Sequence, residues 1–312
     1  MTKPRYRLAV DAALTKGVQV SLRDNAAHYV SGVLRLGVGD AVSLFSKADG
    51  EWRAVIAEIR KKELVLSVEE CTRPPSARGM ELIVCFAPIK GGRLETIIEK
   101  ATELGASVLQ PVITARTIVD KVNLARAEAI AREAAEQCER IDWPEIREPV
   151  KLATLLAGWP ADVPLIYGDE RGESGSILQL FSSPEIRPHP KNVKDIFRPL
   201  PKGEVAPAAS LAKTTIVEVC DEAVPQLTSA LGRGLNFPLE KIQGEGGRRW
   251  AVLTGPEGGF TPEEFAALAR VKSTMGVGLG PRILRADTAV ITLCVATLMA
   301  WGDWDERPRF GV

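Results

Sequence analysis

The pattern of apolar and polar positions divides the chain into two parts that predict different kinds of structure. Over residues 1–72, short runs typical of β-strands are separated by turns, and one helix is expected, over Asn25–Leu36. Glycine and aspartate mark two of the turns, Gly37–Asp40 and Lys47–Gly50. We therefore expect a small β-barrel with strands at Tyr6–Val10, Val18–Leu22, Ala41–Phe45, Trp52–Ile59 and Leu64–Val68.

The second part, residues 73–312, begins in a stretch of linker composition, Thr72–Gly79. Glu81–Ile89 is an apolar run typical of a buried strand, a helix with an apolar face follows it, and Val108–Ile113 is another buried strand. A strand, helix and strand of this length predict two parallel strands joined by a crossover helix. With a further strand at Val163–Tyr167, residues 73–312 predict an α/β domain.

The predicted helix Asn123–Arg140 has a face of small residues, including Ala131, Ala134 and Ala135. Small side chains permit close approach of a neighbouring element. We expect this face to pack against the rest of the domain or against a second subunit.

Two loops near the C-terminus each join an apolar strand to a helix. Trp250–Thr254 leads into the loop Gly255–Phe260, after which Thr261–Glu264 has the sequence of a capping box with proline at the first helical position. The second loop, Gly280–Asp287, precedes the apolar helix Ala289–Trp301. Side by side at the carboxyl edge of a parallel sheet, two such loops form the crevice in which open α/β sheets bind ligands.

The first of these loops does not fit the common phosphate-binding motifs. Gly255–Gly259 lacks the Gly-Lys-Ser/Thr of a P-loop and the spacing G-x-G-x-x-G of a dinucleotide site, which disfavours a nucleotide-phosphate enzyme. Glycines in such a loop also serve turn geometry alone.

The combination of both loops is more specific. Leu253-Thr-Gly-Pro-Glu-Gly-Gly-Phe260 and Leu279-Gly-Pro-Arg-Ile-Leu-Arg-Ala-Asp-Thr-Ala289 resemble the signature of the SPOUT (trefoil-knot) methyltransferases, and most closely the 16S ribosomal RNA uracil-N3 methyltransferase family. The similarity covers residues 1–170 and 250–302, including His28–Leu36, Lys90–Arg93 and Glu136–Arg140. It departs at Ala286-Asp287, where threonine-glutamate is common, and at residues 171–249, which stand as an atypical insertion in place of a short connector.

The resemblance implies a fold, a cofactor and partners. The fold is a SPOUT-like knotted parallel sheet with an N-terminal PUA-like β-barrel that binds RNA. The cofactor is S-adenosylmethionine, and the reaction is methylation of N3 of a specific uridine in small-subunit ribosomal RNA, as naked RNA or in the assembled 30S subunit. A homodimer is expected, with surface offered by Ala289–Trp301 and Asn123–Arg140. A non-catalytic RNA-binding protein on the same scaffold is the alternative.

The residues expected to bind the cofactor lie in the two loops and at their ends. They are Leu253, Thr254, Gly255, Glu257, Gly258, Gly259, Leu279, Gly280, Ile283, Leu284, Thr288 and Ala289.

Three residues of the second loop are expected to act in catalysis. Loss of the proton from uracil N3 spreads negative charge onto O2 and O4, which Arg282 or Arg285 would stabilise. A carboxylate, Asp287 or as a second choice Glu257, would accept the proton directly or through water. Alternatively, Asp287 caps the final helix and Arg282 pairs with it.

RNA contacts are expected from Arg5, Arg7, Arg35, Lys90 and Arg93. Arg5 and Arg7 flank Tyr6 in a segment without acidic residues, which favours phosphate contacts around a stacked base. The alternatives are a solvated edge strand for these two and first-turn surface charge for Lys90 and Arg93. Arg187–Lys202, with five basic residues and four prolines, is expected to be an exposed loop that is solvated or touches RNA.

Composition restricts the partners and the compartment. Lys plus Arg and Asp plus Glu both number 40, so RNA must be held by a local basic surface and not by net charge. The five cysteines form no C-x-x-C pair, which argues against a metal site and a disulfide framework and fits a reducing cytoplasm. Because the longest apolar run, Ala289–Trp301, is too short to cross a bilayer, no membrane association is expected.

Overall fold

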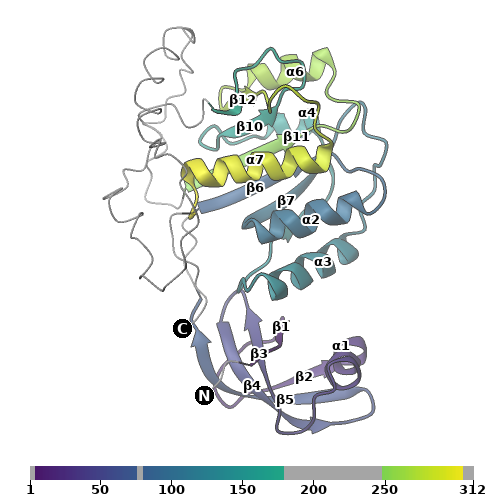
Figure 1. Ribbon diagram of the computed structural model, residues 1–312, viewed down its shortest axis with the longest axis vertical. Coiled ribbons are helices and arrows are strands. Elements are labelled where there is room, and N and C mark those ends of the chain that lie inside the picture. The colour runs from purple at the N-terminus through teal and green to yellow at the C-terminus, as the bar shows by residue number, and fades with distance from the viewer. Residues whose placement is uncertain (1–3, 76–79, 179–247, 305–312) are drawn as a thin grey trace, which may run out of the picture.

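The computed structural model describes residues 4–75, 80–178 and 248–304. The N-terminal domain is a curled sheet of five strands in the order β1-β3-β4-β5-β2, in which only β1 and β3 are parallel (Figure 1). Its strands are β1 (Arg7–Ala9), β2 (Gln19–Arg23), β3 (Ala41–Ser46), β4 (Gly50–Ile59) and β5 (Glu63–Arg73). Between β2 and β3, α1 (Asp24–His28) continues into a π-helical turn, η1 (Tyr29–Val33), at the place of the predicted helix.

The second domain is built on a parallel sheet with the strand order β12-β10-β11-β6-β7-β8. Its strands are β6 (Met80–Phe86), β7 (Ala106–Ile113), β8 (Glu145–Ile146), β10 (Leu165–Gly168), β11 (Arg248–Thr254) and β12 (Thr274–Val277), and β9 (Val150–Lys151) pairs with β7 beside this path. Because β11 and β12 both flank β10, the two predicted loops leave the same edge of the sheet, with the end of β10 between them.

Helices cover both faces of this sheet. On one face lie α2 (Arg93–Glu103), α3 (Leu124–Gln137) and α7 (Ala286–Trp301), and on the other lie α4 (Leu152–Ala157) and α6 (Pro262–Arg270) (Figure 1). Successive residues of a strand point to opposite faces, so Val84 of β6 packs in the first core and Cys85 in the second. Burial on both faces explains why the strands have continuous apolar sequences.

The predicted architecture, an α/β domain on a parallel sheet preceded by a domain of short β-strands, is confirmed. The final helix begins three residues earlier than predicted, at Ala286, and β8, β9 and α4 were not predicted. Arg187–Lys202 lies outside the described residues.

The small-residue face of α3 is already covered within the chain. Ala127, Ala131 and Ala135 are buried in the core that includes α2, and α3 also contacts β1 of the N-terminal domain. Of the two alternatives for this helix, packing inside the chain is therefore correct, and this face is not free for a second subunit.

Candidate active site

A cavity of about 340 Å³ lies at the carboxyl edge of the parallel sheet, where three loops meet. They follow β10, β11 and β12. This volume is within the range of small-molecule sites, roughly 300–1,000 Å³. The lining residues are Gly168–Gly172, Thr254–Glu257, Gly259, Gly278–Leu284, Ala286 and Ala289.

The loop after β11 is fixed by the start of α6. Thr261 Oγ1 accepts the backbone N–H of Glu264 at 3.3 Å, and the Glu264 carboxylate accepts the N–H of Thr261 at 2.9 Å, so the predicted capping box is confirmed. The same carboxylate accepts the N–H of Ala115 at 2.7 Å. This second bond ties the start of α6 to the loop after β7.

The loop after β10 is held by a buried carboxylate. Asp169 accepts hydrogen bonds from the backbone and side chain of Arg171, at 3.0 and 3.1 Å, and from Ser174 Oγ at 2.6 Å. Burial raises the pKa of Asp169, but the hydrogen bonds from Arg171 and Ser174 outweigh it, so this pKa lies below its ordinary value. Asp169 therefore stays ionised and shapes the cavity wall.

The loops after β10 and β11 also contact each other directly. Glu170 Oε1 accepts the backbone N–H of Phe260 at 3.1 Å. Gly259 has a φ of +68°, and a Cβ atom there would lie 2.1 Å from Glu170 Oε1. The positive φ favours glycine here, and any other residue would also displace the Glu170 carboxylate.

The loop after β12 carries exposed side chains at the cavity. Gly280, with a φ of +101°, turns the chain, and Ile283 is 91% exposed beside the lining residue Arg282. Within the described residues neither Arg282 nor Arg285 has an ion pair, so the expected alternative, in which Arg282 pairs with Asp287, is not present.

Asp287 does not cap α7. The N-cap position is occupied by Arg285 without a side-chain hydrogen bond, and Asp287 lies in the first turn. Its Oδ1 atom is buried and accepts no hydrogen bond in the described part of the protein. Asp287 itself is absent from the cavity wall, although Ala286 and Ala289 line it.

Most of the predicted cofactor residues lie together at the cavity. Thr254, Gly255, Glu257, Gly259, Leu279, Gly280, Ile283, Leu284 and Ala289 line it, whereas Leu253, Gly258 and Thr288 do not. A Cβ atom on Gly258 would instead meet the Arg116 side chain at 3.3 Å.

The wall formed by Gly168–Gly172 was not predicted from the sequence. The glycines and charged residues directly after a predicted strand were the available signal. Because the insertion was taken to begin at residue 171, this signal was not used.

The cavity fits a ligand with polar groups. Thr254 is 3% exposed, and its buried Oγ1 has no hydrogen-bond partner among the described residues, although the residue lines the cavity. Buried hydroxyls are normally paired. The Thr254 residue therefore brings an unpaired polar group to the cavity wall.

The residues predicted to bind RNA do not share one environment. Arg5, Arg35 and Lys90 are exposed, and Arg93 forms an ion pair with Glu257 at 3.3 Å, at the mouth of the cavity. Arg7 is different, because its guanidinium is buried against Glu51 and backbone carbonyls of the second domain. A phosphate contact from Arg7 is therefore excluded in this arrangement.

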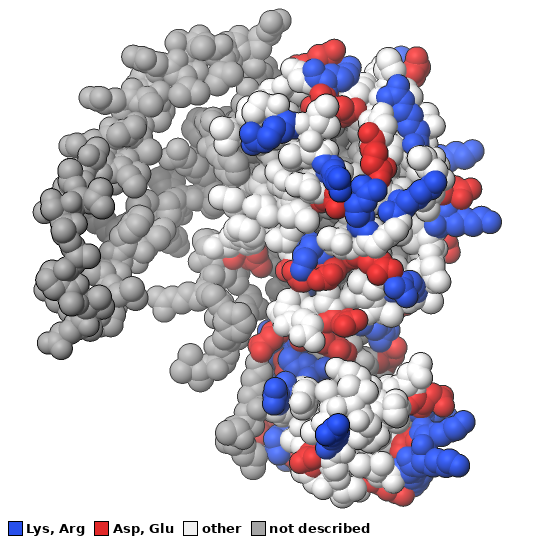
Figure 2. All heavy atoms as spheres, turned by 45° about the vertical axis from the view of Figure 1, so that its right-hand side comes forward, with Lys and Arg blue, Asp and Glu red and all other residues white. Residues whose placement is uncertain are grey.

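Surface charge is mixed on both domains. Figure 2 shows basic and acidic side chains next to one another across the face that it draws. Among the described residues, no cluster of three or more metal-ligating side chains occurs, and no helix has the length and apolarity to span a bilayer.

Comparison with known families identifies both domains. Residues 76–193 and 207–298 match the RNA methyltransferase domain, and residues 22–69 match the RNA methyltransferase PUA domain. The chain therefore belongs to this family of RNA methyltransferases, which confirms the resemblance found in the two loops. The family match extends into residues 171–249, leaving 194–206 unmatched.

Individual relatives cover nearly the whole chain. It is 28% identical over 287 residues to the ribosomal RNA small subunit methyltransferase E of Rickettsia conorii, covering 92% of both proteins. The protein of that name from Synechocystis is 29% identical, over 91% of this chain and 74% of the relative.

Solved structures show the same fold. A methyltransferase from Legionella pneumophila, determined with bound S-adenosylmethionine, gives a TM-score of 0.68 at 22% identity, covering 95% of this chain and 97% of the other. The ribosomal RNA small subunit methyltransferase E of Neisseria gonorrhoeae, bound to S-adenosylmethionine, gives 0.66 at 22% identity, with 96% and 99% covered.

Proposed function

We propose that this protein is an S-adenosylmethionine-dependent methyltransferase that modifies N3 of one uridine in small-subunit (16S) ribosomal RNA. The observation that carries the proposal is the cavity formed by three loops at the carboxyl edge of the sheet, with the unpaired Thr254 hydroxyl in its wall. The relatives named as small subunit ribosomal RNA methyltransferases support the substrate class. The choice of uracil N3 rests on the resemblance of the two loops.

The cavity offers separate places for the parts of the cofactor. Leu279, Ile283 and Leu284 supply apolar contacts for the adenine ring, and Thr254 supplies a hydrogen-bonding hydroxyl. The carboxylate of Glu257 stands at the opening and balances positive charge there. Bound S-adenosylmethionine supplies a methyl group already activated for transfer by the positive sulfur.

The protein must then bind the uracil, exclude water and remove the N3 proton. Arg282 is exposed at the cavity and unpaired among the described residues, so its charge is available to stabilise negative charge on uracil oxygens. Arg285 is exposed and unpaired as well, three residues further along the chain. We assign the anion-stabilising role to Arg282, with Arg285 as the second candidate.

Two carboxylates are candidates for the general base. Glu257 lines the cavity and is held by Arg93, whereas Asp287 has a buried, unpaired oxygen but does not reach the cavity wall. For Asp287 to act, the start of α7 must shift or a second subunit must complete the site. Glu257 needs no such change.

The proposed assembly is a homodimer acting in the cytoplasm. The outward side of α7 carries apolar side chains four residues apart, the half-buried Ile291 and Val295 and the 58% exposed Met299. Such a stripe on a helix next to the cavity offers a two-fold contact. α3, also expected to contribute, has its small-residue face covered inside the chain.

Calorimetry with S-adenosylmethionine, followed by methyl transfer to purified small-subunit RNA and to 30S subunits, tests the proposal. We expect cofactor binding and transfer to at least one of these substrates. RNA binding without cofactor binding would instead establish the non-catalytic RNA-binding alternative.

A further inference from the structure

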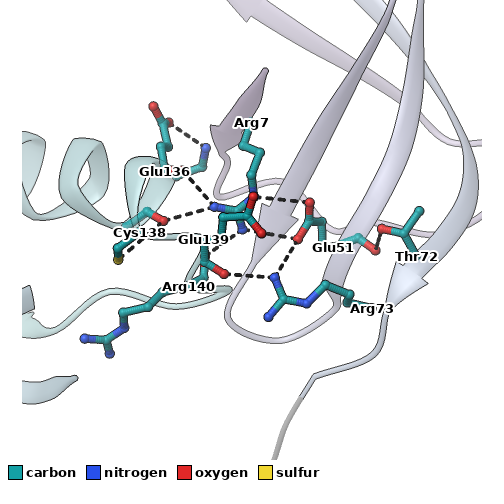
Figure 3. A network of polar contacts seen from close by, with 10 residues as sticks. Arg7, Glu51, Thr72, Arg73, Glu136, Cys138, Glu139 and Arg140 are labelled. Atoms are coloured by element: carbon teal, nitrogen blue, oxygen red, sulfur yellow. Dashed lines mark hydrogen bonds and ion pairs between the residues drawn. The ribbon is translucent and has the colours of Figure 1, made fainter. Parts of the chain in front are cut away.

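A buried network of polar side chains joins the two domains (Figure 3). Arg7 Nε and Nη2 donate to the two carboxylate oxygens of Glu51 at 3.1 and 3.2 Å, and Arg73 Nη1 donates to Glu51 Oε2 at 3.1 Å. The Arg7 and Glu51 side chains are only 5% and 1% exposed. All three residues belong to the N-terminal domain. Each arginine has further N–H groups that do not bond to Glu51 and are available to other acceptors.

The remaining donors reach the other domain at the end of α3. Here the last carbonyl groups of the helix lack intrahelical donors and carry the negative end of the helix dipole. Two arginines from the N-terminal domain donate to carbonyls in the last turn of α3 and in the residues that follow it. Arg7 donates to the carbonyls of Ala135 at 3.0 Å, Glu136 at 2.9 Å and Arg140 at 2.7 Å, and Arg73 donates to the carbonyl of Glu139 at 2.8 Å.

The backbone on both sides of this joint has little freedom. Glu139 has a φ of +60°, a left-handed conformation that non-glycine residues keep only where their surroundings impose it. On the N-terminal domain, Gly50 has a φ of +81°, and a Cβ atom there would lie 2.2 Å from the Arg73 carbonyl oxygen. The end of β5, from which the linker leaves, is thus pressed against the start of β4.

An apolar contact lies beside the polar network. Phe45 of β3 packs edge-on against Trp143, with ring centroids 6.1 Å apart, and the Arg7 guanidinium lies 4.4 Å from the Phe45 ring centre. Apolar burial holds two surfaces together but is not directional. Buried ion pairs add little net stability, whereas several hydrogen bonds at fixed angles define one orientation.

We propose that Arg7, Glu51 and Arg73 are positioning residues that hold the N-terminal domain at one angle to the cofactor cavity. RNA bound by that domain then presents its target nucleotide to the cavity. The network lies at the end of α3, whereas the cavity is lined by the loops after β10, β11 and β12. The network therefore affects the position of the bound RNA relative to the cavity and not the binding of the cofactor. This inference rests on the proposed function.

The test compares Glu51→Gln and Arg7→Met with the wild type and with Glu69→Gln. Glu69 is a matched control, because it is a β5 carboxylate of the same domain that pairs with Arg53, but it is 47% exposed and has no hydrogen bond to the second domain among the described residues. Domain orientation is measured as the distance distribution between bio-orthogonal spin labels at Lys16 and Ala153, both exposed and one on each domain. S-adenosylmethionine affinity, small-subunit RNA affinity and kcat are measured on the same samples.

We expect the distance distribution to broaden in the two joint variants and kcat to fall by about 10- to 100-fold, since a misplacement of about 1 Å costs roughly 10²-fold. Both dissociation constants should stay within about twofold, and Glu69→Gln should match the wild type. Unfolding would instead reduce the stoichiometry of cofactor binding. Arg73→Met, which removes a 26% exposed side chain and leaves the Arg7–Glu51 pair, then serves as the milder variant, with the same effects at smaller size.

An unchanged distance distribution in variants that bind the cofactor fully would overturn the inference, as would unchanged kcat. If the wild type transfers no methyl group to small-subunit RNA, the proposed function is wrong. The distance measurement still decides in that case whether the network sets the angle between the domains.

Discussion

Replacing Thr254 by valine should change protein stability and cofactor affinity in opposite directions. Thr254 Oγ1 is buried, and no atom in the described part of the chain bonds to it; a buried unpaired polar group costs about 1–3 kcal/mol. Valine has nearly the same shape and a high preference for strands, and the residue ends β11. Thr254→Val should therefore leave the free energy of unfolding of the free protein unchanged or raise it.

The same substitution removes a group proposed to bond the cofactor. A net hydrogen bond contributes about 0.5–1.5 kcal/mol, so the dissociation constant for S-adenosylmethionine should rise roughly two- to twelvefold. Denaturant unfolding and calorimetry on the same samples measure the two effects.

A matched control is Thr297→Val on α7. Thr297 is fully buried, but its hydroxyl donates to the Leu293 carbonyl at 2.8 Å, and it lies outside the cavity wall. This variant should lose up to about 1 kcal/mol of stability and keep its cofactor affinity. Unchanged affinity in Thr254→Val, or destabilisation equal to that of Thr297→Val, would refute the assignment of the Thr254 hydroxyl to the ligand.

Three further predictions concern catalysis, pH and assembly. Glu257→Gln and Asp287→Asn separate the two candidate bases. The variant that lacks the true base should have a kcat about 10²–10⁴-fold lower and a flattened acid limb in its pH–rate profile. Equal and small effects of the two substitutions on kcat would exclude both carboxylates as the base. Burial raises the pKa of Glu51, but the hydrogen bond and charge of Arg7 and the charge of Arg73 hold it below its ordinary value of 4.5. Ionised Glu51 therefore stabilises the folded protein above that pH, and this contribution is lost as the pH falls. The difference in Tm between the wild type and Glu51→Gln should shrink below about pH 4.5. A difference in Tm that stays constant with pH would contradict this. Met299→Asp should shift the expected dimer to monomer in light scattering, with the dimer dissociation constant raised roughly 30-fold or more, and a fully active wild-type monomer would rule the dimer out.

The sequence predicted features that depend on local pattern. The strand-to-helix loop at Gly255–Phe260 was predictable because the capping box that ends it, Thr261 to Glu264, is a motif of four consecutive residues. The two loops came together as expected because parallel strands end at one edge.

The features that were not predicted depend on partners distant in the sequence. Arg7 appears in the sequence as an exposed basic residue, but its acceptors at Ala135 and Arg140 lie 128 and 133 residues away. The third cavity wall, after β10, was missed for another reason: the partners of Asp169, Arg171 and Ser174, are local, but residue 171 was taken as the start of the insertion. Asp287 lies between Ala286 and Ala289, which line the cavity, but it lies in the first turn of α7 and is not part of the cavity wall.

Nucleoside mass spectrometry of small-subunit ribosomal RNA tests the central claim most directly. RNA from a strain lacking this protein should lack one 3-methyluridine that is present in the parent, and purified protein with S-adenosylmethionine should restore it. Identical nucleoside profiles in both strains, or restoration of a methyl group on another base or another atom, would contradict the assignment of uracil N3 methylation to this protein.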